Sequence, residues 1–184
     1  MVRKVMGAGL VLALVVSGVA LGAAKAKTFS TGNISNGISG GHAISQSLTV
    51  KKKGKIKDLN VGVAFTTNEN DDFTFSVMSP KGKMVQLSSE NGGSGAGYGS
   101  SCSSNEITTF DDEAAQDIQD YDGVDHVFDG VSYKPEQYND NSQTGGLVDF
   151  DGSQLKGKWR LIVTDTEDIG AGSLKCFTLT AKTK

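Results

Sequence analysis

Residues 72–87 read DFTFSVMSPKGKMVQL, and this stretch carries the pattern that decides the fold. Phe73, Phe75 and Val77 alternate with polar or small residues, which is the period of a half-buried β-strand. The tetrapeptide at 79–82 then places proline at the second and glycine at the fourth position of a type I turn. The stretch therefore predicts two strands joined by a tight turn.

The same alternation recurs on both sides of this stretch. Residues at every second position share one face in three further segments, 44–50, 59–65 and 159–163, and these positions are apolar except for Gln46. Two more strands are expected at 107–110 and 173–181. Glycine-rich turns separate these segments, and the longest helix that we expect is a single turn at 114–120. Many short strands with glycine turns are typical of an antiparallel sandwich or barrel. Trp159 begins one of the alternating segments, so we expect it in the core.

The chain is predicted to have three parts. Residues 1–26 combine a positive start, a charge-free apolar run and a small-x-small cleavage site at Ala24-Lys25-Ala26, which is typical of a secretory signal peptide. An uncleaved membrane anchor is the alternative, because the run approaches the length of a bilayer span. Residues 27–43 are rich in Ser, Gly and Asn without any period, which predicts a flexible arm. Residues 44–184 then form the β-domain.

The charge of the chain argues against nucleic-acid binding. The formal net charge is −3, and removal of the signal takes away Arg3, Lys4 and Lys25 but no acid, which leaves −6. Affinity for nucleic acids depends on neutralising phosphates with basic residues, so we expect no such partner. The 24 glycines follow no three-residue period, which excludes a collagen-like chain. After signal removal we expect no membrane association.

Two cysteines, Cys102 and Cys176, form an even pair in a chain that we expect to be exported. A disulfide between them is the first interpretation, since oxidising compartments favour bridges. Two unpaired thiols are the alternative, because the sequence does not show how closely their Cα atoms approach.

Six ordered blocks resemble a known family. They read GKIKDLNVGV at 54–63, DFTFSVMSPKG at 72–82, FDDEA at 110–114, FDG at 150–152, LKGKWRLIVTD at 155–165 and GSLKCFTL at 172–179. Together they resemble the P domain, or Homo B domain, that follows the subtilisin-like catalytic domain in kexin- and furin-type proprotein convertases and in some bacterial proteases. The resemblance implies a jelly-roll β-sandwich of about eight mostly antiparallel strands.

The resemblance also implies a role, which is to pack against and stabilise a serine protease domain. The segment before Ile44 is far too short for such a catalytic domain, so we expect the protease, or another secreted or surface protein, to be supplied separately. A free-standing adhesive module that binds carbohydrate or protein is the alternative. The signal predicts a secreted, periplasmic or other cell-envelope location.

A catalytic role is not expected. Gly92-Gly93-Ser94-Gly95-Ala96 superficially resembles the nucleophile region of subtilisin-like proteases, but Ser94 lies in a glycine-rich loop that we expect to be mobile. A nucleophilic serine needs a base and an orienting carboxylate on a rigid frame, and the histidines are His42 in the arm and His126 in the acidic middle. Two histidines and two cysteines also fall short of the usual catalytic zinc ligand sets.

Calcium is the cofactor that the sequence favours. Ten acids and no Lys or Arg lie between Met84 and Tyr133, and hard oxygen ligands of this kind suit Ca²⁺. The candidate ligands match family positions that are expected to meet at one end of the sandwich: Asp72, Asp111, Asp112, Glu113 and Asp165. The alternative is that Asp111 and Asp112 accept hydrogen bonds from turn N–H groups.

Overall fold

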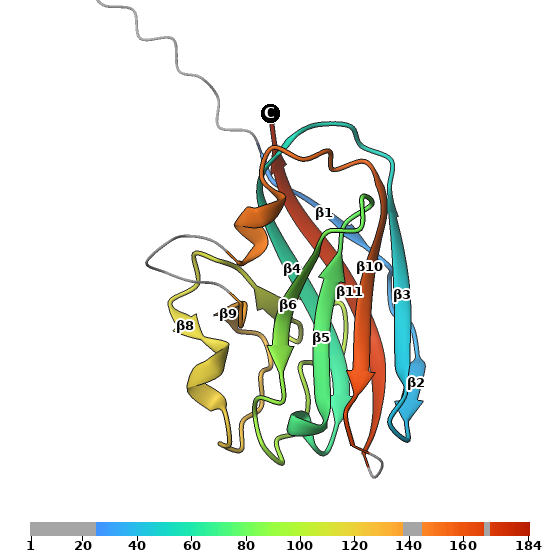
Figure 1. Ribbon diagram of the computed structural model, residues 1–184, viewed down its shortest axis with the longest axis vertical. Helices are drawn as coiled ribbons and strands as arrows, with labels where there is room; N and C mark the ends of the chain where they lie inside the picture. Colours follow the sequence, from blue (N-terminus) through green and yellow to red (C-terminus); the bar gives the residue numbers. More distant parts are fainter. Residues whose placement is uncertain (1–24, 138–144, 168–169) are drawn as a thin grey trace, which may run out of the picture.

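Two β-sheets pack face to face in the computed structural model, which describes residues 25–137, 145–167 and 170–184 (Figure 1). The predicted signal peptide falls almost wholly on residues 1–24, which lie outside the described residues. The described part contains strands and three short 3₁₀ helices: η1 (Asn70–Asp72), η2 (Ile118–Tyr121) and η3 (Leu147–Phe150). No helix in these described ranges has the length and apolar character needed to cross a membrane.

The larger sheet has seven strands in the order β1-β11-β4-β7-β9-β8, with β2 also paired to β11. Its strands are β1 (Lys27–Ser30), β2 (Asn36–Ser39), β4 (Ile56–Thr67), β7 (Thr108–Phe110), β8 (Gln116–Asp117), β9 (Ser132–Lys134) and β11 (Ala171–Thr183). The smaller sheet has the order β3-β10-β5-β6. Its strands are β3 (Ala43–Val50), β5 (Phe73–Met78), β6 (Met84–Ser89) and β10 (Gly157–Asp165).

The predicted all-β sandwich is confirmed. The pairs are antiparallel except that β9 runs parallel to both β7 and β8. The described residues form eleven strands rather than about eight, because short strands that the alternation does not reveal extend the larger sheet.

Alternating apolar side chains of both sheets form the core. Val61, Val63 and Phe65 of β4 are fully buried, as are Phe73 and Phe75 of β5. The ring of Phe65 meets those of Phe73 and Phe75 edge to face, with centroids 4.7 and 5.2 Å apart. Such aromatic pairs stabilise beyond the area they bury. The predicted hairpin of β5 and β6 thus contributes buried side chains from the smaller sheet to the core.

The turn between β5 and β6 is as predicted. The backbone N–H of Gly82 donates to the carbonyl oxygen of Ser79 at 3.0 Å, which closes the turn. Gly82 has a φ of 87°, a conformation that glycine adopts without steric cost. The turn therefore fixes how β5 and β6 pair.

Residues 27–43 are not the flexible arm that their composition predicts, and that expectation is wrong. β1 pairs with the last part of β11, and β2 pairs with its first part. Between them, the backbone N–H groups of Thr31 and Ile34 donate to Phe177 and Lys175 at 3.0 and 2.9 Å. The folded unit therefore begins near Lys27 rather than at residue 44.

The glycine-rich segment around Ser94 is packed against the core, which corrects the expectation of a loose loop. Tyr98 is fully buried, and its hydroxyl lies 3.0 Å from both Ser88 Oγ and the carbonyl oxygen of Asn91. A Cβ atom at Gly95 would lie 1.9 Å from the carbonyl oxygen of His126. Only glycine allows the two backbones to approach so closely.

A disulfide joins Cys102 and Cys176, whose Cα atoms are 5.3 Å apart, so the predicted bridge is confirmed. Cys176 is a buried residue of β11, and Cys102 follows the glycine-rich segment. The bridge therefore ties this segment to the outer side of the larger sheet, where Ala64 and Ile107 pack against it.

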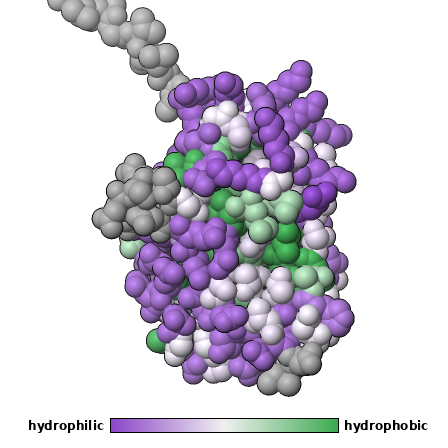
Figure 2. All heavy atoms as spheres, in the orientation of Figure 1, coloured by the Kyte–Doolittle hydropathy of each residue, from purple (hydrophilic) through white to green (hydrophobic). Residues whose placement is uncertain are grey.

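The outer face of the smaller sheet carries a hydrophobic patch, which we define by Met78, Met84 and Ile162. Register places Met78 opposite Met84 on β6 and opposite Arg160 on β10. Met84 is 53% exposed, more than any other large apolar side chain among the described residues. Figure 2 shows hydrophobic residues gathered over these strands, with hydrophilic residues around them.

Candidate functional site

The five predicted calcium ligands form two groups at opposite ends of β4, so the expectation that all five meet is wrong. Asp111, Asp112 and Glu113 follow β7, which pairs with the first half of β4, where Val61 lies opposite Phe110. Asp72 lies just beyond the other end of β4, at the end of η1.

Asp165 lies with Asp72 in the second group, because the last residue of β10 pairs with Phe73 at the start of β5. Strand register, which spacing along the chain does not reveal, therefore separates the two groups. No set of three or more His, Cys, Asp or Glu side chains within the described residues is grouped so that it could hold a metal ion. Calcium binding stays a prediction.

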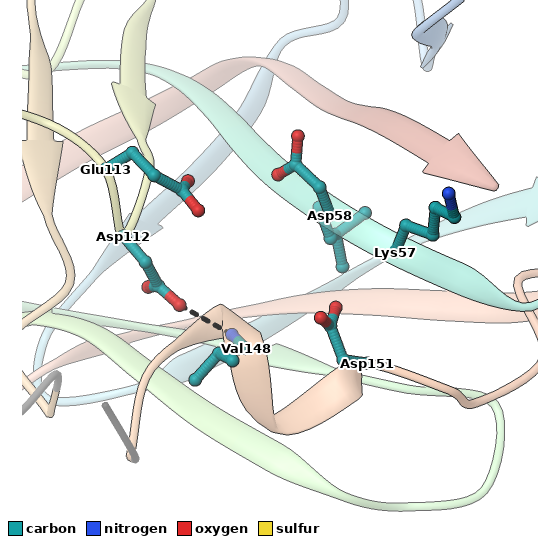
Figure 3. A pocket seen from close by; sticks show the side chains of 7 residues that line it. Lys57, Asp58, Asp112, Glu113, Val148 and Asp151 are labelled. Atoms are coloured by element: carbon teal, nitrogen blue, oxygen red, sulfur yellow. Dashed lines mark hydrogen bonds between the residues drawn. The ribbon is translucent and has the colours of Figure 1, made fainter. Parts of the chain in front are cut away.

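The first group belongs to an acidic pocket beside η3. Figure 3 shows Asp58 and Glu113 facing one another across this pocket, with Asp151 on a third side. The pocket is lined by Lys57, Asp58, Leu59, Asp112, Glu113, Val148 and Asp151. Burial, followed by the charges of Asp58 and Asp112, raises the pKa of Asp151. The pocket thus concentrates negative charge where β4 begins.

Asp58 and Asp151 were not predicted as site residues. Both lie inside blocks that resemble the P domain, at 54–63 and 150–152, but neither stands in a run of acids. An aspartate without acidic neighbours carries no sequence signal for a site, and the packing of β4 against η3 brings Asp58 and Asp151 together.

Asp112 has a structural role in this pocket. Its carboxylate accepts hydrogen bonds from the backbone N–H groups of Leu147 at 3.0 Å and Val148 at 2.6 Å. These are the first N–H groups of η3, which have no partner inside the helix. Burial raises the pKa of Asp112, although both hydrogen bonds act in the opposite direction. Asp112 thus accepts hydrogen bonds from backbone N–H groups, as the alternative to a calcium ligand predicts.

Asp111 and Glu113 form a close pair of carboxyl groups. Asn60 Nδ2 donates to Asp111 Oδ2 at 2.6 Å, and the backbone N–H of Glu113 donates to Asp111 Oδ1 at 3.0 Å. The hydrogen bond with Asp111, then burial and the charges of Asp111 and Asp58, raise the pKa of Glu113 to about 7. Lys182 pairs with Asp58 on the same side. The pair therefore holds a proton at pH values where most glutamates are ionised.

Replacing Glu113 with glutamine is expected to flatten the pH dependence of stability. Because its pKa is raised from 4.5 to about 7 on folding, its stabilising contribution is complete below pH 4.5 and is lost as the pH rises through 7. Glu113→Gln keeps a neutral side chain at every pH. The free energy of unfolding, measured by urea denaturation between pH 4 and 8.5, should therefore fall less steeply in the variant than in the parent.

The control for this experiment is Asp129→Asn, which changes an exposed acid in the same acid-rich stretch between Met84 and Tyr133. It should leave the slope of stability against pH unchanged. Parallel curves for the parent and Glu113→Gln would show that this carboxyl group does not hold the proton.

The two sequence candidates for a catalytic base have other partners. His126 Nε2 lies 2.9 Å from Tyr133 Oη, and the ring stacks on Tyr121 at a centroid distance of 3.9 Å. Burial lowers the pKa of His126. His42 Nδ1 lies 2.9 Å from the carbonyl oxygen of Ser39. Both imidazoles are thus engaged in contacts that support local structure.

Ser94, the candidate nucleophile, is exposed. Its backbone N–H donates to Asp125 Oδ1 at 3.0 Å. This contact ties the glycine-rich segment to the loop after η2 and involves the main chain of Ser94, not its hydroxyl group.

Comparison with solved structures finds two similar crystal structures: a serine protease of Aeromonas sobria (14% identity, TM-score 0.49) and the Aeromonas sobria serine protease in complex with the chaperone (15% identity, TM-score 0.45). In both, the matched region covers 87% of this chain but only 26% of the other protein, so this chain spans about a quarter of their length. No curated protein matches the sequence.

A family model also matches the sequence. The family model of the proprotein convertase P-domain matches residues 56–181, from the first residue of β4 to near the end of β11. This match confirms the resemblance that the six sequence blocks carry. The chain therefore belongs to the proprotein convertase P-domain family.

Proposed function

We propose that this P-domain is a non-catalytic module that binds and stabilises a subtilisin-like serine protease. The observation that carries the proposal is the family match, which extends over both sheets of the sandwich. The P domains that the sequence resembles accompany subtilisin-like catalytic domains, and this association supports a subtilisin-like protease as the proposed partner.

The contacts of the histidines support a non-catalytic role. A serine nucleophile requires a base within hydrogen-bonding reach, held in place by a third group. His126 is instead bonded to Tyr133, and His42 to the main chain of Ser39. The proposed contribution of the domain is therefore binding energy, which it supplies to a separate catalytic unit.

The hydrophobic patch of Met78, Met84 and Ile162 is the surface that we assign to the protease. Exposed apolar groups rimmed by polar residues are typical of protein-binding surfaces. The patch lies on a regular sheet, which presents its side chains without reordering of the main chain on binding. Methionine is well suited to such a surface, because its flexible thioether adapts to the partner's shape.

Export from the cytosol is part of the proposal. The positive start and apolar run of residues 1–26 favour a signal peptide, and the Cys102–Cys176 bridge supports an oxidising compartment. A protease partner is accordingly expected in the same secreted or envelope fraction.

The domain is expected to slow the thermal inactivation of its protease. A ligand that binds only the native protease stabilises it by mass action, so the half-life should rise by roughly twofold or more when the domain exceeds its dissociation constant. Residual peptidase activity after heating, with and without the purified domain, measures this effect on the subtilisin-like proteases of the producing organism.

Two variants connect this effect to the patch. Met84→Asp places a charge in the patch. The variant should therefore be required at a roughly tenfold higher concentration than the parent domain to give the same protection. Val127→Asp is the matched control, because Val127 is also exposed, at 47%, but lies in the loop before β9. Equal protection by parent and Met84→Asp would exclude this face, and the absence of protection by the parent would contradict the proposed function.

A further inference from the structure

The tripeptide Lys-Gly-Lys occurs three times in the chain, at 53–55, 81–83 and 156–158. Lys51 and Lys52 precede the first copy, so these stretches together carry eight lysines and no acid. The three copies lie before β4, between β5 and β6, and at the start of β10. We call the eight side chains the lysine cluster: Lys51, Lys52, Lys53, Lys55, Lys81, Lys83, Lys156 and Lys158.

The fold brings the first and third copies together. Lys55 forms an isolated antiparallel bridge with Gln154, and the backbone N–H of Leu155 donates to the carbonyl oxygen of Gly54 at 3.0 Å. On its other side, β10 begins opposite Val50, the last residue of β3. The segment that leads from β3 to β4 is therefore held against the segment that leads into β10.

The second copy lies against the third. A Cβ atom at Gly157 would lie 2.5 Å from the Cβ atom of Pro80, so the turn between β5 and β6 closely approaches the start of β10. All three copies thus lie at one end of the sandwich, the upper end in Figure 1. Figure 2 shows hydrophilic side chains gathered over this end.

The positive charges of the lysine cluster are largely unpaired. Lys83 pairs with Asp149 at 3.2 Å. The other seven lysines form no ion pair with an acid in the part of the chain that the structure describes. Lys52 is partly buried, and the rest are exposed. Like charges gathered in this way repel one another unless anions lie beside them.

The rest of the chain is strongly acidic. The cluster holds more than half of the 15 basic residues that remain after removal of the signal, which leaves seven basic residues against 21 acids. The two signs of charge meet at η3, where Val148 lines the acidic pocket and Phe150 lines a separate cavity of about 110 Å³ with Lys81 and Lys83. Asp149, the acid in the lining of that second cavity, is the partner of Lys83. Positive and negative charges are therefore sorted onto different surfaces of the domain.

We infer that the lysine cluster binds the surface of a lipid bilayer that contains anionic phospholipids. Clusters of roughly four to eight basic side chains are attracted to such surfaces, and each lysine adds to the affinity. Met84, which directly follows the second copy and is 53% exposed, places an apolar group beside the lysines. Basic and apolar groups side by side suit the boundary between head groups and acyl chains. This inference does not depend on the proposed protease partner.

The chemistry of the cluster favours a bilayer over another macromolecule. All its cations are lysines, whose strongly hydrated ammonium groups act as point charges on flexible stems. Protein interfaces are depleted in lysine. Single-stranded nucleic acids are bound with aromatic side chains on which bases stack, and the three tripeptides contain none. Because three separate segments spread the charges over one end of the domain, the array matches a layer of head groups better than a single linear chain.

The inference departs from the expectation of no membrane association, which rests on the net charge of the chain. At an ionic strength of about 0.1 M, charges are screened beyond about 10 Å. Asp165 lies at the other end of β10 from Lys158, roughly 20 Å away at about 3.3 Å per residue. A bilayer that meets this end therefore interacts mainly with the lysines, and the acids at the far end of the sandwich are screened from it.

Vesicle sedimentation tests the inference with the protein from residue 25 onward, which contains every strand of both sheets. The apolar run at 5–24 is left out, because a run of that length can insert into a bilayer by itself. Vesicles of phosphatidylcholine alone are compared with vesicles that also contain about 30 mol% phosphatidylglycerol. We expect binding to the anionic vesicles at about 50 mM NaCl, its loss at about 500 mM NaCl, and no binding to the neutral vesicles.

Charge-neutralising variants locate the effect. Lys53→Gln, Lys81→Gln and Lys156→Gln together remove one charge from each copy and should weaken binding roughly a hundredfold, because each lysine near an anionic surface contributes roughly fivefold. The triple variant should fold with an unfolding midpoint no lower than that of the parent, since these side chains form no ion pair within the described ranges. Arginine at the same three positions keeps the charge and should keep the binding.

The matched control for a single charge is Lys175→Gln, on β11 of the larger sheet. Lys81→Gln should weaken vesicle binding roughly fivefold, and Lys175→Gln by less than about twofold. The inference is overturned if the parent does not bind the anionic vesicles, or if the triple glutamine variant binds them as strongly as the parent. Capture of the parent by immobilised polygalacturonate without binding to the anionic vesicles would also overturn it, and would assign the cluster to an anionic polysaccharide.

Discussion

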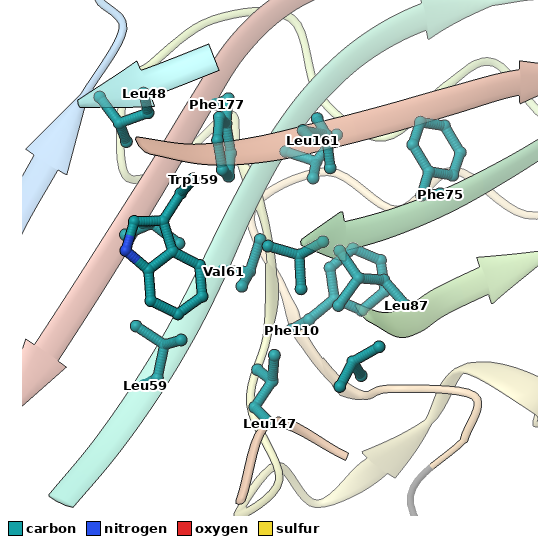
Figure 4. Packing of buried hydrophobic residues seen from close by; sticks show 14 of the residues in the cluster. Leu48, Leu59, Val61, Phe75, Leu87, Phe110, Leu147, Trp159, Leu161 and Phe177 are labelled. Atoms are coloured by element: carbon teal, nitrogen blue, oxygen red, sulfur yellow. The ribbon is translucent and has the colours of Figure 1, made fainter. Parts of the chain in front are cut away.

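Trp159→Ala is expected to lower the free energy of unfolding by about 3–5 kcal/mol, the range for truncating a fully buried aromatic side chain. Trp159 is 0% exposed, and its ring meets Phe150 edge to face at a centroid distance of 5.1 Å. Its Nε1 donates to the carbonyl oxygen of Leu155 at 2.8 Å, so truncation also leaves that buried oxygen unsatisfied. Figure 4 shows the indole within a core to which both sheets contribute.

The measurement is guanidinium chloride unfolding followed by circular dichroism, because the chain has only one tryptophan and the variant loses its fluorescence signal. Met84→Ala is the matched control, since Met84 is more than half exposed, and its effect should stay within about 0.5 kcal/mol. A loss below about 1 kcal/mol for Trp159→Ala would contradict the central position of this residue. A loss of the expected size would remove a large share of the roughly 5–15 kcal/mol that stabilises a typical domain.

Removing the disulfide by the double substitution Cys102→Ala and Cys176→Ala is expected to cost about 4 kcal/mol. The two cysteines are 74 positions apart, and opening a loop of that length returns conformational entropy to the unfolded chain. The bridge also holds the glycine-rich segment against β11, so its loss frees that segment at one end. Urea unfolding of the parent and the double variant measures the difference.

Chemical reduction provides the control for this prediction. Dithiothreitol should lower the stability of the parent to that of the double variant and leave the double variant unchanged. If the parent and the double variant unfold at the same urea concentration, the bridge does not restrict the unfolded chain in this way.

The side-chain alternation predicted those strands that face the core. Val61, Val63 and Phe65 recur at every second position and are all buried, as the alternation indicated. β1 and β2 carry no such signal, because most of their side chains are exposed and the strands are held by backbone pairing with β11. Backbone hydrogen bonds are independent of residue type, so composition alone made this segment resemble an arm.

The glycines of residues 92–99 give a similarly ambiguous signal. Gly95 and Gly99 suggested a loose loop, but each is required where a carbonyl oxygen of another segment comes within 2.0 Å of the position of a Cβ atom. Glycine serves both open loops and close backbone contacts, and only the fold distinguishes the two. The buried Tyr98 between them is the residue that the loop brings into the core.

The candidate site was predicted in its residue types but not in its grouping. The acids at 111–113 and the pair of Asp72 and Asp165 all lie at strand ends, as their positions in the pattern indicated. Which end of the sandwich each occupies depends on the pairing of β4 with β7 and of β5 with β10. Register between strands distant in sequence is set by packing, so residue spacing did not reveal it.

Direct detection of a complex with a subtilisin-like serine protease tests the central proposal. The purified domain is mixed with the inhibited protease of the producing organism and analysed by size-exclusion chromatography with light scattering. We expect a complex that Met84→Asp weakens and Val127→Asp leaves intact. Separate elution of the two proteins at concentrations of about 10 μM, together with binding of the domain to an immobilised glycan, would contradict the proposal and favour an adhesive module.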